Sequence, residues 1–168
     1  MTQLVPAHEG NFTHGRNGHA ITRGYFHRTA VKGDTAIGEA NYFKSHIVQA
    51  SAGVFIDLDG VVIQSVADTD TEWAVNELDE NLISFSIEFT GLNGTPLTAK
   101  QIASAIAFIK GDELIAAIPK HRLSITEIPP RKVGGWANHR DVTTAYKIAG
   151  GHTDAISEPE IAQILRGV

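Results

Sequence analysis

The sequence predicts an α/β fold in which a single mixed β-sheet is flanked by helices. Segments with the two-residue hydrophobic period of strands alternate along the chain with segments of helical period, which is typical of α/β proteins. The pair Asp59-Gly60 lies between two apolar runs and predicts a β-hairpin. The length of 168 residues predicts one domain over residues 1–168, beginning with an irregular arm at residues 1–18.

Five segments are predicted to be strands: residues 21–27, 54–58, 61–66, 82–89 and 122–128. Residues 82–89 alternate most clearly, with Phe85, Ile87 and Phe89 on one face and Glu88 on the other. This pattern leaves two interpretations of Glu88, a solvated carboxylate on the strand surface or an acid that faces a cleft. Residues 68–76 are polar and predict a loop, in which Trp73 either lines a cleft or covers the edge of the core.

Helices are predicted from apolar periodicity and from the residues that can cap them. Thr35 can cap a helix over residues 35–45. Thr98 opens a longer helix, because Gln101 stands after it at the spacing of a capping box. That helix is interrupted near residues 111–112, before residues 114–118. A terminal helix over residues 158–165 has Ser157 as its cap and a proline in its first turn.

The composition excludes several kinds of site and partner. The chain has no cysteine, so disulfides and thiolate ligands are excluded and a metal would be held by His, Asp or Glu. The formal net charge of −5 disfavours nucleic acid as the main partner. No apolar run approaches the length that crosses a membrane, so no membrane insertion is expected. Residues 1–18 lack the apolar core of a signal peptide, so we expect a protein made in the cytoplasm.

The candidate site centres on residues 135–142, Gly-Trp-Ala-Asn-His-Arg-Asp-Val, and on residues 151–154, Gly-His-Thr-Asp. Because glycines and polar residues lie between the histidine and the aspartate, the two stretches together are predicted to form a loop that brings nitrogen and oxygen ligands together. His139 and Asp154 supply an imidazole and a carboxylate, which suit a borderline divalent ion and zinc first. His27, at the end of a predicted strand, is the third donor, and the fourth position is left open for water. Taken alone, His27 or His139 is more often a packed or exposed imidazole than a ligand.

The order of the motifs along the chain is more specific than any one of them. A strand ending in histidine is followed by an Asp-Gly hairpin, a strand with a carboxylate next to a glycine, a long helix, a His-Arg-Asp-Val motif and a late aspartate. This order resembles the zinc-dependent N-acetylmuramoyl-L-alanine amidases of type 2, the superfamily that phage endolysin amidases share with peptidoglycan recognition proteins. The resemblance extends over nearly the whole chain and rests on six segments: residues 11–16, 26–30, 57–60, 84–91, 138–142 and 152–154.

The resemblance implies an endolysin-like, bacteriolytic hydrolase whose partner is bacterial peptidoglycan. His27, His139 and Asp154 would hold Zn²⁺, Glu88 would be the catalytic base, and His152 would face the developing oxyanion. The bond cleaved would be the amide between N-acetylmuramic acid and L-alanine of the stem peptide. Such an enzyme, favoured as a monomer, would act on the cell wall after release from the cell that makes it, for example a phage-infected host.

Four sites depart from the family pattern. Gly53 stands where a histidine or tyrosine is common, and Ala74 stands where the family often has the histidine of Trp-His-Ala-Gly. Ala155-Ile156 replaces a usual Pro-Gly, and His152 stands where many members carry lysine.

Two alternatives therefore remain open, a non-catalytic module that binds peptidoglycan and a zinc peptidase that acts on another amide. The intact set of candidate ligands, together with Glu88, argues against the first. The chain contains no His-Glu-x-x-His motif, which argues against the second.

Overall fold

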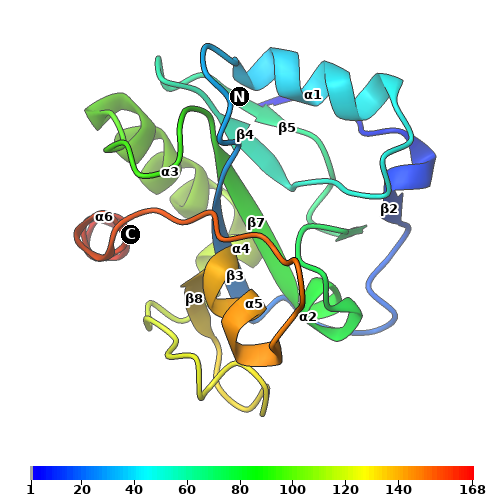
Figure 1. The fold of residues 1–168 in the computed structure, drawn as a ribbon, viewed down its shortest axis with the longest axis vertical. Coiled ribbons are helices and arrows are strands. Elements are labelled where there is room, and N and C mark those ends of the chain that lie inside the picture. The colour runs from blue at the N-terminus through cyan, green and yellow to red at the C-terminus, as the bar shows by residue number, and fades with distance from the viewer. Residues whose placement is uncertain (1) are drawn as a thin grey trace.

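The computed structural model describes residues 2–168, which form a six-stranded mixed sheet between two layers of helices (Figure 1). In spatial order the strands are β1 (Gln3–Leu4), β5 (Val62–Gln64), β4 (Val54–Ile56), β7 (Ser84–Phe89), β3 (Arg23–Arg28) and β8 (Gly135–Asn138). The β4–β5 pair is antiparallel and the other pairs are parallel. The predicted α/β class, with one mixed sheet and a hairpin at residues 59–60, is therefore confirmed.

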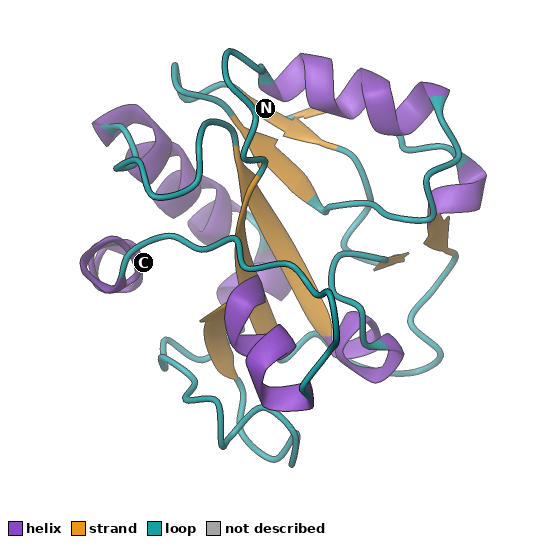
Figure 2. Cartoon of the chain, viewed as in Figure 1, coloured by secondary structure: helices purple, strands orange, loops and turns teal. Residues whose placement is uncertain are grey.

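Figure 2 shows the sheet crossing the middle of the molecule between the helix layers. One face packs against α3 (Ala99–Gly111), α4 (Glu113–Ala116) and α6 (Glu158–Gly167), whose apolar residues share the largest core cluster with the strands. The other face is covered by α1 (Ala36–Ser45), α2 (Leu78–Ile83) and α5 (His139–Tyr146). No helix in residues 2–168 is both long enough and apolar enough to span a membrane.

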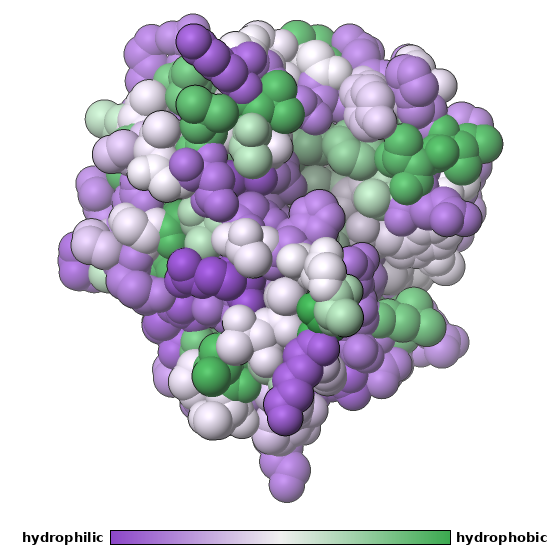
Figure 3. Space-filling view, in the orientation of Figure 1, coloured by the Kyte–Doolittle hydropathy of each residue, from purple (hydrophilic) through white to green (hydrophobic). Residues whose placement is uncertain are grey.

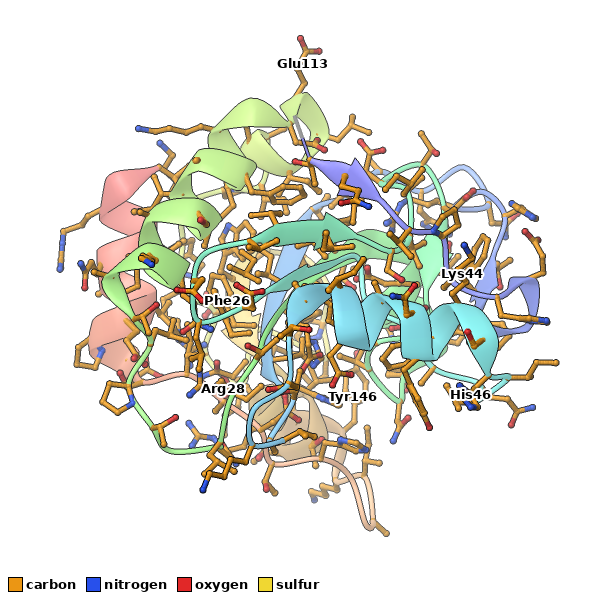
Figure 4. The ribbon with its side chains drawn as sticks, turned by 90° about the horizontal axis from the view of Figure 1, so that it is seen from above. Phe26, Arg28, Lys44, His46, Glu113 and Tyr146 are labelled. Atoms are coloured by element: carbon orange, nitrogen blue, oxygen red, sulfur yellow. The ribbon has the colours of Figure 1, made fainter. Side chains whose placement is uncertain are left out.

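One glycine and two aromatic rings form the packing on the core-facing side of β3 and β8. The rings of Phe26 and Trp136 stack with centroids 4.9 Å apart, and Figure 4 shows Phe26 in the interior near α3. Gly24 lies directly under the indole, because a Cβ at this position would be 2.2 Å from the ring of Trp136. Alternation along β3 therefore points Phe26 into this core and His27 to the opposite face.

The predicted helix starts are confirmed. The hydroxyl of Thr35 accepts a hydrogen bond from Gly38 N at the start of α1. Thr98 and Gln101 form the expected capping box at α3, and Ser157 forms one with Glu160 at α6. The interruption after Gly111 is also present, since Asp112 ends α3 and caps α4.

The strand predicted at residues 122–128 is wrong. Residues 125–130 form consecutive turns, and Arg122 makes only an isolated bridge, to Trp136. Ser124 donates from both its backbone N and its hydroxyl to the Glu127 carboxylate, at 2.8 and 2.7 Å. These local side-chain bonds replace the ladder that the apolar alternation had predicted.

The loop predicted over residues 135–142 is also wrong, because this stretch is strand β8 followed directly by helix α5. Gly135 permits a close approach of backbones rather than a loop, since a Cβ there would lie 2.4 Å from the carbonyl oxygen of His121. Within the region that holds the two candidate motifs, the irregular chain is confined to residues 147–157, between α5 and α6.

Other segments also differ from the prediction. The strand expected to begin at residue 82 begins at Ser84, because Leu82 and Ile83 belong to α2. The loop at residues 68–76 contains β6 (Thr71–Glu72), which pairs with β2 (Phe12–Thr13) in a separate two-stranded sheet. Residues 2–18 are less irregular than expected, since they contribute β1, β2 and a 3₁₀ turn at Glu9–Asn11.

Candidate functional site

Three of the predicted site residues lie at the carboxyl ends of neighbouring parallel strands. His27 on β3 is in register with Glu88 on β7, and His139 follows β8 as the first residue of α5. All three are on the face opposite α3, in agreement with the alternation along each strand. The carboxyl ends of strands are the usual place for ligand sites in open α/β sheets.

Asp154 completes the cluster from the irregular segment after α5. Its two carboxylate oxygens lie 3.4 Å from His27 Nδ1 and 3.1 Å from His139 Nδ1. The backbone N of Arg28 donates to Asp154 Oδ2 at 3.2 Å, and the backbone N of Arg140 donates to the Asp154 carbonyl at 3.3 Å. The structure thus brings together the three residues that the sequence predicted as ligands.

The donor set fits a metal ion. His27, His139 and Asp154 each offer one ligand atom, and these atoms lie within 4.8 Å of one another. All three residues are buried, and His27 Nε2, His139 Nε2 and Asp154 Oδ1 have no hydrogen-bond partner among residues 2–168. Buried polar atoms without partners are costly unless something else binds them. Two imidazoles and one carboxylate are a common protein ligand set for zinc.

The charge states of these residues also favour cation binding. Burial lowers the pKa of the His139 imidazole, with a further contribution from nearby His27, so the neutral form that can ligate is favoured. Burial alone would raise the pKa of the Asp154 carboxyl. The imidazoles of His139 and His27, which lie close to its oxygens, outweigh burial and hold that pKa below its usual range, so Asp154 is a carboxylate.

Glu88 faces the cluster and is not a solvated surface carboxylate. Its Oε2 atom lies 3.8 Å from His27 Nδ1, and its side chain is 16% exposed. Burial, followed by the charge of Asp154, raises the pKa of the Glu88 carboxyl well above its ordinary value. A carboxyl group with a raised pKa beside a cation site is suited to accepting and returning a proton near neutral pH.

A groove of about 200 Å³ runs from this cluster along α1. Figure 3 shows this face hollowed beside α1, with hydrophobic residues, in green, gathered near the C-terminal end of that helix. Trp73 lines the groove together with Phe43 and Ala52, and Glu39 adds a carboxylate to the wall. Of the two alternatives for Trp73, the structure thus supports the cleft. A larger hollow, of about 710 Å³, lies beside β5 and α3 and contains none of the predicted site residues.

His152 lies at the rim of the groove. Its side chain is 70% exposed, and its ring stacks on that of His139 with centroids 5.2 Å apart. Its Nδ1 atom is 3.8 Å from Asp154 Oδ1, which is beyond hydrogen-bond distance. The imidazole is thus free to point an N–H group at a molecule in the groove.

Comparison with known families decides the classification. The family model for N-acetylmuramoyl-L-alanine amidase, type 2, matches residues 17–155, a span that includes the whole cluster. The chain belongs to this amidase family. A comparison with curated proteins found no match.

Solved structures share the fold with this amidase family member. The hydrolase AmiA of Staphylococcus aureus, solved with its ligand, matches with a TM-score of 0.71 and 18% identity, over 99% of this chain and 82% of that one. The endolysin amidase LysCS of Clostridium intestinale matches with a TM-score of 0.62 and 16% identity, over 99% and 97%. A mutant endolysin from Bacillus subtilis gives a TM-score of 0.65 and 18% identity, over 98% of each chain.

Sequence reasoning missed several residues of the amidase groove. Glu39 and Phe43 occupy one helical face of α1, but no local signal distinguished that face from any other. Asn138 precedes a candidate ligand at the end of a strand, and its complete burial was not predicted. The signal available in the sequence for Asn138 was its place as a polar residue directly before the candidate ligand His139.

Proposed function

We propose that this protein is a zinc-dependent N-acetylmuramoyl-L-alanine amidase that hydrolyses the amide between the lactyl group of N-acetylmuramic acid and L-alanine of the stem peptide. The observation that carries the proposal is the buried cluster of His27, His139 and Asp154 beside Glu88 in an open groove. Membership of the amidase family supports the substrate class.

His27, His139 and Asp154 would hold the zinc ion. When bound, zinc supplies a Lewis acid that polarises the amide carbonyl and acidifies a water molecule. The Arg28 and Arg140 backbone N–H groups keep Asp154 in place through the bonds described above, so the site is preorganised by the fold.

Glu88 would carry the proton from the attacking water to the leaving group. Its carboxylate accepts a proton as the water oxygen bonds to the carbonyl carbon. The resulting carboxylic acid returns this proton to the amide nitrogen as the carbon–nitrogen bond breaks. The products are a carboxylate on the lactyl group and a free amino group on L-alanine.

His152 would donate a hydrogen bond to the carbonyl oxygen as negative charge develops on it. Its position at the groove rim, stacked on His139, supports this role because the ring is exposed yet held close to the cluster. Lysine is common here in the family, and both side chains offer an N–H donor.

We also propose an endolysin-like role, in which the enzyme lyses bacterial cell walls as a monomer after release from the cell that makes it. Similar structures, among them those of the Clostridium intestinale and Bacillus subtilis proteins, are endolysins. A non-catalytic peptidoglycan-binding module and a zinc peptidase are the competing functions, and the assay below separates them.

The test is digestion of purified cell walls by the zinc-loaded protein. The proposal expects new amino-terminal alanine without new reducing sugar ends. Walls that are bound but not cleaved would instead indicate a recognition module. New amino groups from residues other than that alanine would indicate a peptidase.

Glu88→Gln tests the assignment of the base. The variant keeps the shape of the side chain and removes its proton-accepting carboxylate, so turnover should fall by roughly 10²–10⁴. Zinc content and wall binding should be retained. Glu113→Gln is the matched control, because Glu113 is exposed and projects into solvent on α4 (Figure 4). Equal turnover in the two variants would reject Glu88 as the base.

A further inference from the structure

The carboxylate ligand is the candidate ligand whose position no helix or strand fixes. His27 lies within β3 and His139 begins α5, whereas Asp154 lies in the irregular residues 147–157. The location of Asp154 relative to the two imidazoles therefore depends on individual contacts, both the bonds that Asp154 accepts from Arg28 N and Arg140 N and those made by its neighbours in the chain.

One such contact comes from Asn138. Its amide nitrogen donates to the carbonyl oxygen of Ile156 at 3.1 Å, and its amide oxygen accepts from the backbone N of Ile156 at 3.0 Å. The two bonds close a ring between the Asn138 side chain and the backbone N–H and C=O groups of a single residue, Ile156. Asn138 is completely buried, and Ile156 packs into the main core cluster, so water does not compete for these bonds.

The same residue also adjoins both histidine ligands. Asn138 is the residue directly before His139, and its backbone pairs in the sheet with Phe26, the residue directly before His27. Its backbone N donates to the Asp141 carboxylate at 2.9 Å, which fixes the start of α5. Thus Asn138 is connected to the three segments that carry the candidate ligands.

We propose that Asn138 is a positioning residue for the metal site, whose side-chain amide sets the place of Asp154 and thereby the affinity for zinc. This inference rests on the zinc site of the proposed function. Removing the amide leaves the N–H and C=O groups of Ile156 buried without partners, which favours movement of residues 154–156 toward water. Loss of a partner that orients a ligand typically costs 10–100-fold in metal affinity.

A purely structural role is the competing explanation, and the chain contains a matched control for it. Asn81 forms the same closed pair with the backbone of a single residue, donating to the Val75 carbonyl at 2.8 Å and accepting from Val75 N at 2.9 Å. Asn81 is also buried, at 5% exposed, but it lies in α2 and adjoins none of the three ligands. Removing either amide costs folding stability, and only Asn138 should change zinc binding.

The experiment compares wild-type protein with Asn138→Ala, Asn138→Ser and Asn81→Ala. Each is stripped of metal, and its zinc dissociation constant is measured by competition with a chelator of known affinity. Urea unfolding with and without zinc gives the stabilisation that zinc adds to each protein. The serine variant disturbs the packing least and serves if the alanine variant does not fold.

We expect the zinc dissociation constant to rise by about 10–100-fold in the Asn138 variants and by less than about threefold in Asn81→Ala. The stabilisation added by zinc should shrink only in the Asn138 variants. An unchanged dissociation constant in the Asn138 variants, or an equal rise in Asn81→Ala, would overturn the inference. Because the readout is metal affinity, a wild-type protein that binds zinc yet cleaves no wall would reject the proposed function alone.

Discussion

Two buried glutamates show how differently single residues are accommodated in this fold. Glu80 is completely buried and receives hydrogen bonds from Arg23, Tyr25 and Tyr146, at 2.7–2.9 Å. Glu72 is equally buried, but neither carboxylate oxygen has a hydrogen-bond partner at bonding geometry among residues 2–168, although Arg16 and Ser86 lie nearby. The first carboxylate is stabilised by its partners, whereas the second is costly to keep charged.

Glu72 also accounts for the departure of position 53 from the family pattern. A Cβ on Gly53 would lie 2.3 Å from the ring of Phe85 and 2.6 Å from Glu72 Oε2. The space beside Gly53 is thus already filled by Glu72 and Phe85, so the histidine or tyrosine common at this position has no room here.

The stability of the protein should depend on the protonation of Glu72. Burial raises the pKa of its carboxyl from 4.5 to about 8, against the opposing effects of Arg16 and Ser86. A raised pKa in the folded state means that the contribution of this group is complete below pH 4.5 and is lost as pH rises to about 8. The free energy of unfolding of the wild-type protein should therefore decrease as pH rises across this window, in addition to the effects of other groups.

Glu72→Gln removes this titration while keeping the shape of the side chain. The variant should be similar to wild type near pH 4.5 and more stable than wild type near pH 8, measured by urea unfolding in the presence of a metal chelator. If the difference between the two proteins stayed constant with pH, Glu72 would have an ordinary pKa in the folded state.

Among the elements, the spacing of β3 and β8 depends on Gly24. The Trp136 ring covers this position, and the sheet edge then turns directly into α5 with the candidate ligand His139. A methyl group at position 24 would displace either the indole or the strand, so the packing of two elements and the start of a third depend on the absence of one side chain.

Gly24→Ala should therefore destabilise the protein by about 1–3 kcal/mol or more, the usual cost of overpacking a core. Gly111→Ala is the matched control, because no atom lies within 4 Å of the Cβ that it adds at the end of α3. That control should be neutral or slightly stabilising, since alanine restricts the unfolded chain. Equal midpoints of denaturation for the two variants would contradict the packing argument.

At the scale of the whole molecule, the candidate metal site joins the beginning of the chain to its end. His27 comes from the first long strand, whereas His139 and Asp154 come from the last part of the chain. An ion bound by all three residues cross-links segments that are remote in sequence. Because the unfolded chain has no preformed site, such an ion binds the folded state preferentially.

Zinc should consequently raise the thermal midpoint of the whole domain. At a free concentration 100 times the dissociation constant, the expected stabilisation is about 2.7 kcal/mol, which corresponds to several degrees. A chelator should reverse the shift. Asp154→Ala should abolish it, while His121→Ala, which removes an exposed histidine bonded to Glu127, should keep it. A full shift in Asp154→Ala would place the metal elsewhere.

The parts of the fold predicted from sequence are those with local signals. Asp59-Gly60 fixed the hairpin, and the pair Thr98 and Gln101 fixed the start of the long helix, because a turn or cap is made by residues close in the chain. Residues 122–128 and β8 were wrongly assigned, because strand pairing depends on partners remote in sequence. The short β8 pairs with β3 over four residues, whereas the better alternating segment makes only an isolated bridge, from Arg122 to Trp136.

The candidate site was predicted to a similar extent. His27 and Glu88 could be placed from sequence because each lies near the carboxyl end of a predicted strand, and His139 could be placed because its motif resembles one of the amidase family. The bond between Asn138 and Ile156 and the burial of Glu72 could not be predicted. Both depend on which remote segment comes to lie against the side chain.

The position of β3 within the sheet also has a consequence for synthesis of the protein. β3 is made early, yet one of its neighbours in the sheet is β8, which leaves the ribosome only after most of the chain. Until then the edge of β3 around Gly24 and Tyr25 has no strand to pair with, and unpaired edges promote association between chains. A chain stalled or cleaved before Gly135 is thus an aggregation-prone fragment, even though it retains His27 and Glu88.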